Sequence, residues 1–225
     1  ESFGSLLQHF TGSKHHNIKL REFAIKKKMS VSDYGIKYGG KLHEFKTEEE
    51  FYKFLGMDWI VPEMREDTGE IEAALAHKLP KVIELEEIKG DIHLHSNYPI
   101  EPSHDSGKAS FEEIIHKAKS FSYEYVGLSD HSPGVSTHTK NKIVKLIEKR
   151  TKKIEQLKSS IKNIGILNLL EIDILTNGQL SVPKEGLKML DGAIAGIHSS
   201  HSQDKKTITS RLLTAIRSPY VQVIS

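Results

Sequence analysis

The sequence contains no cysteine, and this absence excludes a whole class of sites. Disulfide bonds and thiolate metal centres are impossible, so any bound metal must rest on imidazole, carboxylate and water. Such ligands suit zinc, manganese or iron. Long apolar runs are also absent: no stretch approaches the roughly 20 residues that span a membrane, and no basic-then-apolar signal opens the chain. The sequence therefore predicts a cytoplasmic protein without a membrane partner.

Neither sign of charge dominates the chain. Its 225 residues include 32 Lys and Arg against 30 Asp and Glu, a formal net charge of +2, and 37% are hydrophobic, which suits one or two globular domains. The balance is uneven locally, because residues 14–46 are mostly basic among their charged positions. Such a segment suits contact with a phosphate backbone, and a solvated helix face is the alternative.

Residues 1–80 have the pattern of a small α+β unit. Thr47 and Glu50 match a capping box at a helix start, and Gly56 is placed to end that helix. The expected elements are helices at 17–28, 47–55 and 71–79 and a hairpin at 29–45. Residues 81–89 form an acidic connector, and we place the domain boundary there.

From residue 90 to residue 225, short apolar runs alternate with amphipathic segments, which predicts parallel strands joined by crossover helices. The expected helices cover 111–121, 140–161 and 205–217, with Ser110 and Thr139 as N-caps. Four apolar runs end in histidine or carboxylate: 90–95, 125–131, 169–173 and 193–198. Side chains at the carboxyl ends of neighbouring parallel strands meet at one edge, so the pattern favours a metallohydrolase on a barrel-like scaffold.

The first and third of these runs each carry a pair of ligand-type residues. His93 and His95 lie two apart on a predicted strand, so both side chains leave the same face while their apolar neighbours face a core. Glu171 and Asp173 have the same spacing in an apolar run, where an unpaired carboxylate is costly to bury. We expect one of them to meet a cation. For Asp173 the alternative is a salt bridge or a strand-end cap.

The remaining candidates follow the other two strands and one loop. We expect His131 and His198 to be ligands, although for His198 a satisfied core histidine is the alternative. Asp130 would orient an imidazole or accept a backbone N–H rather than bind metal. In the loop after His95, either His104 or Asp105 could be a ligand. Exposed surface positions are expected for His15, His16, His43, His77, His116 and His138.

A cluster of histidines and carboxylates without thiols suits a multinuclear zinc or manganese site that lowers the pKa of bound water and holds an anionic oxygen. Hydrolysis of a phosphate ester is the reaction that such a site favours. Another metallohydrolase, such as a member of the amidohydrolase group, also begins with His-x-His after a strand. That group commonly needs a modified lysine as the bridging ligand, a position that Glu171 fills better here.

The strand-end motifs and the N-terminal residues resemble those of a known family. The four strand-end motifs, Gly90 to His95, Ser129 to Ser132, Glu171 to Leu175 and Gly196 to Ser200, look like successive motifs of the PHP (polymerase and histidinol phosphatase) domain. Residues 1–14 and on to 62–66 resemble the end of the palm and the thumb of family X DNA polymerases. The resemblance covers essentially the whole chain. It implies an α/β fold: a small α+β thumb unit followed by a partial, distorted (β/α) barrel of PHP type.

The resemblance also implies roles for individual residues. His93, His95 and Glu171 would bind one metal, with Glu171 bridging to a second held by His198. A third metal would be held by His131 with His104 or Asp105. Glu171, His131 and Asp130 would be the catalytic residues of a 3'-5' exonuclease or phosphoesterase that uses manganese or zinc. DNA and nucleotide contacts in the thumb would come from Phe10, Gly12, Ser13, Lys14, Asn17 and Arg21.

Finally, the resemblance implies a piece of a longer DNA repair polymerase, a monomer acting on primer-template or gapped DNA with dNTP. The magnesium-binding polymerase carboxylates would precede Glu1, and later PHP ligands would follow Ser225. Two departures from the family pattern are His9, where an aromatic residue is usual, and a longer loop from Tyr98 to Gly107. A non-catalytic DNA-binding fragment is the main alternative function.

Overall fold

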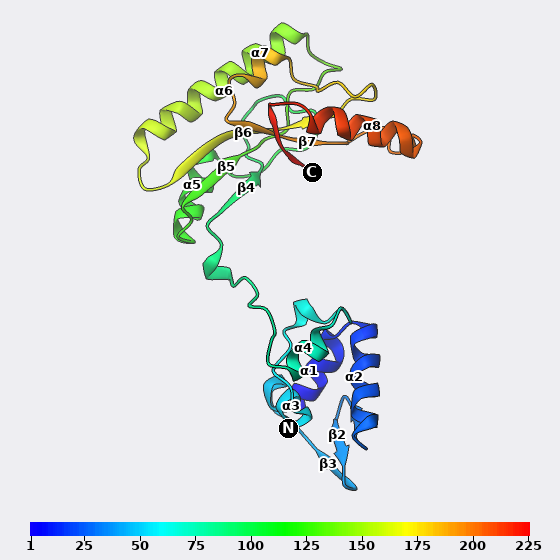
Figure 1. The fold of residues 1–225 in the computed structure, drawn as a ribbon. Helices are drawn as coiled ribbons and strands as arrows, with labels where there is room; N and C mark the ends of the chain where they lie inside the picture. Colours follow the sequence, from blue (N-terminus) through cyan, green and yellow to red (C-terminus); the bar gives the residue numbers. More distant parts are fainter. The chain divides into compact units, whose positions relative to one another are not determined.

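The computed structural model describes residues 1–225 and divides them into two compact units, Glu1–Val82 and Ile83–Ser225 (Figure 1). The predicted α/β class is confirmed. Residues 83–89, expected as a connector, belong to the second unit, where the 3-10 helix η2 (Leu85–Glu87) precedes the first strand of that unit. None of the helices combines the length and apolar character that crossing a membrane requires.

The first unit is mainly helical. Its elements are α1 (Phe3–Thr11), α2 (Lys14–Lys26), β1 (Ser30–Ser32), β2 (Gly35–Tyr38), β3 (Lys41–His43), α3 (Glu48–Leu55), η1 (Pro62–Met64) and α4 (Glu70–Leu75). The segment expected as one hairpin is a three-stranded antiparallel sheet in the order β1-β2-β3. Gly39 and Gly40 form the turn from β2 to β3 with φ of 58° and 79°, a conformation that glycine adopts without steric cost.

Helix α3 begins and ends where its sequence predicts. The Thr47 hydroxyl accepts the N–H of Glu50, and Gly56 ends the helix in the left-handed conformation. The Glu50 carboxylate accepts the N–H of Lys46 rather than that of Thr47, so the capping box is closed one residue earlier than expected. The apolar side of α3 packs in the core of the first unit, which contains Leu20, Ile36, Phe51, Tyr52 and Ile60.

The second unit is a curved parallel sheet with helices on one face (Figure 1). Its five strands lie in sequence order, β4-β5-β6-β7-β8, and every neighbouring pair is parallel. The strands are β4 (Gly90–Leu94), β5 (Tyr125–Leu128), β6 (Gly165–Asp173), β7 (Gly192–Gly196) and β8 (Val221–Ile224), and the helices are α5 (Phe111–Ser120), α6 (Lys140–Ser160), α7 (Lys184–Leu187) and α8 (Lys205–Ile216). This arrangement is half of a (β/α) barrel.

The helices begin at residues whose side chains cap them. Ser110 forms a complete capping box with Glu113, and the Thr139 hydroxyl accepts the N–H of Lys142. Helices α5 and α6 then pack onto the sheet through apolar side chains. Ile115 and Ile154 meet Val126 of β5 in one core cluster. Ile143 and Ile147 meet Leu170 and Ile172 of β6 in a second.

This packing decides which way the ligand-type side chains point. In β6, Leu170 and Ile172 face the helices, and because successive side chains alternate, Glu171 and Asp173 face the opposite side of the sheet. In β4, Leu94 packs in the helix-facing core, which turns His93 and His95 to the same inner face. The inner face of the sheet therefore collects the histidines and carboxylates at the carboxyl ends of the strands.

Candidate metal centre

Six of the predicted ligands form two groups at the carboxyl ends of the strands. One group contains His93, His95 and Glu171, and the other contains His104, His131 and His198. Within each group, one possible ligand atom per residue lies within 4.8 Å of the others. Strands β4 to β7 and the loop after β4 thus deliver side chains that are far apart in sequence to one place.

Glu171 is the residue that links the two groups. Its Oε2 lies 2.8 Å from Nε2 of His93 and 3.2 Å from Nε2 of His95. The same oxygen is 3.6 Å from Nδ1 of His131. Its Oε1 faces the other way, 3.0 Å from Nε2 of His198. One carboxylate therefore offers an oxygen to each side, which is the arrangement of a bridging ligand.

The electrostatics keep these ligands ready to bind a cation. Burial raises the pKa of Glu171, but the hydrogen bond from His93 and the charge of nearby imidazoles outweigh it, so the net pKa is below the ordinary value. Burial lowers the pKa of His131, against the opposing effect of Glu171. Near neutral pH the site therefore contains an ionised carboxylate and a neutral imidazole, the forms that bind metals.

Two buried nitrogen atoms lack a hydrogen-bond partner, and both belong to this cluster. They are Nδ1 of His95 and Nδ1 of His131. A buried polar atom without a partner costs free energy, and imidazole nitrogen is a usual ligand of zinc and manganese. The unpartnered nitrogens, the neighbouring carboxylate and the absence of thiols together fit a divalent metal site.

The loop after β4 brings both of its candidates to the cluster. Ser103 donates its backbone N–H to the carbonyl of Ser132, which holds the loop beside His131. His104 belongs to the second ligand group. Asp105 is 82% exposed and its Oδ1 lies 3.4 Å from Nε2 of His131. The geometry favours His104 as the ligand and leaves Asp105 at the solvent edge of the site.

Asp173 has a role that its sequence position left open. Its Oδ1 lies 2.7 Å from Nδ1 of His198. A carboxylate that accepts a hydrogen bond from one imidazole nitrogen fixes the tautomer of the ring. Here it directs the other nitrogen of His198, Nε2, toward Glu171. The contact has the geometry of the salt bridge expected as the alternative for Asp173, and it connects Asp173 to a residue of the ligand groups.

Asp130 was predicted to be catalytic, and the structure shows what its carboxylate contacts. One of its oxygens accepts hydrogen bonds from Arg150, and the other accepts the backbone N–H of Ser96. It is 3% exposed and is not a member of either ligand group. The Ser96 contact matches the expected alternative that Asp130 accepts a backbone N–H, and its catalytic role stays a prediction.

Arg150 is a residue that the sequence reading missed. It lies in a lysine-rich helix and looks like one more solvated charge, yet it is wholly buried. A signal was available, because Arg150 occupies the apolar stripe of α6 that is otherwise formed by Ile143, Ile147, Ile154 and Leu157. A charged residue on a buried stripe must have partners inside the fold.

The predicted DNA-contacting residues all lie where α1 meets α2. Phe10, near the end of α1, is 75% exposed. Gly12 ends α1, and the Ser13 hydroxyl accepts the N–H of His16 to begin α2 one residue later, at Lys14. An added Cβ at Gly12 would lie 2.7 Å from the Asn17 side-chain oxygen, so a larger residue here would displace the Asn17 amide.

Asn17 and Arg21 are directed toward α1. The Asn17 amide accepts a hydrogen bond from Gln8 and donates one to the carbonyl of His9. Arg21 lies 3.2 Å from Nδ1 of the same His9, the position at which the family usually has an aromatic residue. These contacts fix the turn between the helices, with Lys14 exposed beside it.

Of the six histidines predicted to be exposed, His15, His77 and His116 are exposed, His43 and His138 are half-buried, and the prediction for His16 is wrong. His16 was expected at the surface, but it is fully buried. Its Nδ1 lies 2.6 Å from Glu70 and its Nε2 lies 2.9 Å from the Tyr52 hydroxyl. Burial lowers the pKa of His16 despite the adjacent carboxylate. The neutral imidazole therefore donates from Nδ1 to Glu70 and accepts the Tyr52 hydroxyl at Nε2.

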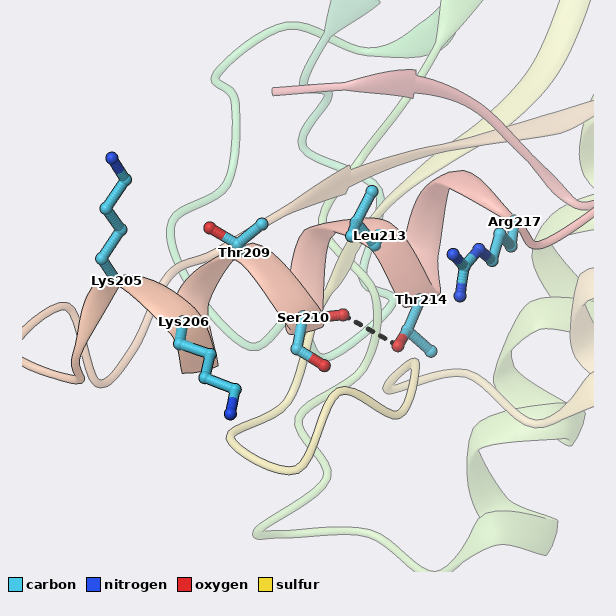
Figure 2. A pocket seen from close by; sticks show the side chains of 7 residues that line it. All are labelled: Lys205, Lys206, Thr209, Ser210, Leu213, Thr214 and Arg217. Atoms are coloured by element: carbon cyan, nitrogen blue, oxygen red, sulfur yellow. Dashed lines mark hydrogen bonds between the residues drawn. The ribbon is translucent and has the colours of Figure 1, made fainter.

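A surface hollow of about 540 Å³ lies along α8 (Figure 2). Its lining includes Lys205, Lys206 and Arg217 but none of the ligand residues. Figure 2 shows that the side chains of Lys205 and Lys206 extend away from each other. The cations do not converge on one point, so we assign no binding site to this hollow.

Two comparisons with known proteins found similar sequences. Residues 6–66 match the family described as the DNA polymerase beta thumb. The chain is also 34% identical, over 227 residues, to the DNA polymerase/3'-5' exonuclease PolX of Bacillus subtilis (strain 168). That alignment covers 100% of this chain and 38% of the relative, so the chain spans well under half of the relative's length. Over its whole length the chain is therefore similar to a relative of the kind that its motifs predicted, and residues 6–66 match the polymerase thumb.

Proposed function

We propose that the second unit is a PHP-type phosphoesterase domain that removes nucleotides from DNA 3' ends, and that the first unit, called the thumb below, holds the DNA. The protein that contains both would be a DNA repair polymerase that uses dNTP and magnesium elsewhere in its structure. The observation that supports the nuclease most strongly is the position of Glu171, with one oxygen toward His93 and His95 and the other toward His198.

The residues of each ligand group would hold divalent metal, manganese or zinc. His93, His95 and Glu171 form one set, and His104, His131 and His198 form the other. Metals bound there would supply Lewis-acid polarisation of a phosphodiester and a source of hydroxide at neutral pH. The protein supplies the geometry: Asp173 fixes the imidazole of His198, and Asp105 lies at the solvent-exposed edge of the site.

The thumb contributes positive charge and a rigid turn. Lys14 is exposed at the start of α2, where the helix dipole also favours negative charge. Gly12 allows the backbone to approach a ligand closely, and Phe10 presents an exposed aromatic ring beside it. Such a turn suits contact with a phosphate backbone and with a base or sugar.

The nuclease proposal is tested with the 225-residue chain, manganese and single-stranded DNA labelled at its 5' end. Shortening from the 3' end is expected for the natural sequence. The variant His93→Ala/His95→Ala should lose it. His116→Ala is the matched control, because His116 is an exposed histidine on α5 of the same unit. Normal shortening by the double variant would contradict the site.

The same experiment separates the nuclease from a non-catalytic DNA-binding function. A chain that binds the labelled DNA and manganese, yet never shortens the DNA, would support DNA binding alone. The two outcomes differ in product length on a denaturing gel, and binding is followed in parallel by fluorescence anisotropy.

A further inference from the structure

Arg150 is a buried side chain with three hydrogen-bond partners next to the ligand cluster. It extends from α6 and is completely buried. Its Nε and Nη2 lie 2.8 Å and 2.7 Å from Oδ2 of Asp130. Its Nη2 also donates to the carbonyl of Leu128, the last residue of β5, at 2.9 Å. The guanidinium therefore holds the end of β5 immediately before the ligand His131.

The same guanidinium reaches the strands on both sides of β5. Its Nη1 donates to the side-chain oxygen of Asn168 in β6 at 2.7 Å, three residues before Glu171. Through Asp130, whose second oxygen accepts the N–H of Ser96, it also fixes the backbone directly after His95. One side chain thus connects β5 and β6 directly and the end of β4 through Asp130, and each of these strands leads to a ligand of the site.

We infer that Arg150 is a positioning residue of the metal site, which sets the spacing of His95, His131 and Glu171 through Asp130 and Asn168. This inference rests on the proposed function of the second unit. Only a planar fork of donors serves all three acceptors at once, because a lysine ammonium at this position has a single nitrogen. Substitution of a residue that orients a metal ligand commonly changes the metal affinity by about 10 to 100-fold.

A purely structural role is the alternative, and the chain contains a matched example of it. Arg65 in the thumb is also wholly buried, and its Nη1 lies 2.7 Å from Glu48 while its other nitrogens donate to the carbonyl of Ile60. Both arginines are thus buried carboxylate-paired cations, but Arg65 belongs to the other compact unit, whereas Asp130, the partner of Arg150, directly precedes the ligand His131. Loss of either should lower stability, whereas only Arg150 should alter metal binding.

The experiment measures the dissociation constant of Mn²⁺ from the signal of free Mn²⁺ in electron paramagnetic resonance. It compares the natural chain with Arg150→Lys and Arg65→Lys, each shown to be folded by circular dichroism at the temperature used. We expect the Mn²⁺ dissociation constant to rise by about tenfold or more in Arg150→Lys and to stay unchanged in Arg65→Lys. Equal constants for the natural chain and folded Arg150→Lys would overturn the inference while leaving the proposed function standing.

A second variant keeps the inference testable if Arg150→Lys does not fold. Asp130→Asn preserves the shape of the side chain and removes the charge that Arg150 binds. It should raise the Mn²⁺ dissociation constant by a similar factor, and the double variant should be no worse than either single one, because the two residues act as a unit. An unchanged constant in Asp130→Asn would overturn the inference. Absence of Mn²⁺ binding by the natural chain would overturn the proposed function and this inference together.

Discussion

Replacing Arg65 by alanine should destabilise the thumb more than any exposed substitution. The guanidinium is wholly buried and lies 2.7 Å from Oε1 of Glu48, whose side chain is only 5% exposed. It also donates to the hydroxyl of Thr11 at the end of α1, and the backbone carbonyl of Arg65 accepts the N–H of Ser13. The substitution removes the guanidinium's contacts with Glu48 and Thr11 and leaves a buried carboxylate without its cation.

The magnitude follows from the burial of both partners. Breaking a buried ion pair by removing one member costs about 3–5 kcal/mol, since the remaining charge is neither solvated nor paired. In a unit of roughly 60–100 residues, 1 kcal/mol shifts the melting temperature by about 4–8 °C. The lower limits of the two ranges, about 3 kcal/mol and about 4 °C per kcal/mol, multiply to a fall in melting temperature of about 12 °C for Arg65→Ala.

The assay uses the single tryptophan of the chain. Trp59 lies in the first unit, and its indole N–H donates to the Glu48 carboxylate at 3.3 Å. Thermal unfolding followed by tryptophan fluorescence therefore reports the thumb rather than the second unit. Lys53→Ala is the control, because Lys53 is exposed on α3 of the same unit. A melting temperature of Arg65→Ala equal to that of Lys53→Ala would refute the reasoning.

Three further predictions follow from charges in the structure. Burial lowers the pKa of His16 in the folded chain below its ordinary value of about 6.5. As the pH falls below about 6.5, the unfolded chain therefore binds a proton at His16 before the folded chain does, and the free energy of unfolding decreases. The pKa of its partner Glu70 is lowered as well, so that carboxylate's contribution is lost only at still lower pH. The Trp59 melting temperature should therefore be lower at pH 5.5 than at pH 7.5, and a rise would contradict a neutral His16. Lys14→Ala/Arg21→Ala should weaken DNA binding and reduce the slope of log affinity against log salt by about two, whereas an unchanged slope would place the DNA elsewhere. Mn²⁺ affinity should decrease as the pH is lowered, because metal binding requires deprotonated ligands, and titration calorimetry at constant ionic strength would reveal a flat profile if other groups were the ligands.

The local pattern of the sequence was sufficient to predict most elements of the second unit. The alternation around Leu170, Glu171 and Ile172 determines which side chains face the helices, so the inner position of Glu171 follows from the strand period alone. Ser110 and Thr139 cap their helices because capping depends on contacts within one turn. The site could be predicted for the same reason, since its ligands follow strands whose ends meet at one edge.

Features that depend on distant residues could not be predicted in this way. His16 has a helical, charged neighbourhood in sequence, but its partners Tyr52 and Glu70 are 36 and 54 residues away. Asp130 lies next to a ligand in sequence, but Arg150 from the following helix occupies its carboxylate. Tertiary contacts of this kind decide whether a charged side chain is solvated or buried. The local pattern of apolar and polar residues does not reveal such distant partners.

The position of Glu171 between two groups of histidines is the central claim, and Mn²⁺ binding by Glu171→Gln tests it most directly. Glutamine keeps the shape of the side chain but lacks the charge that both groups share. Glu185→Gln, at an exposed glutamate of α7, is the matched control. Bound metal is counted by elemental analysis after equilibrium dialysis. The structure predicts that the natural chain and Glu185→Gln retain Mn²⁺ and that Glu171→Gln loses it. Equal metal content in Glu171→Gln and the natural chain would contradict the claim.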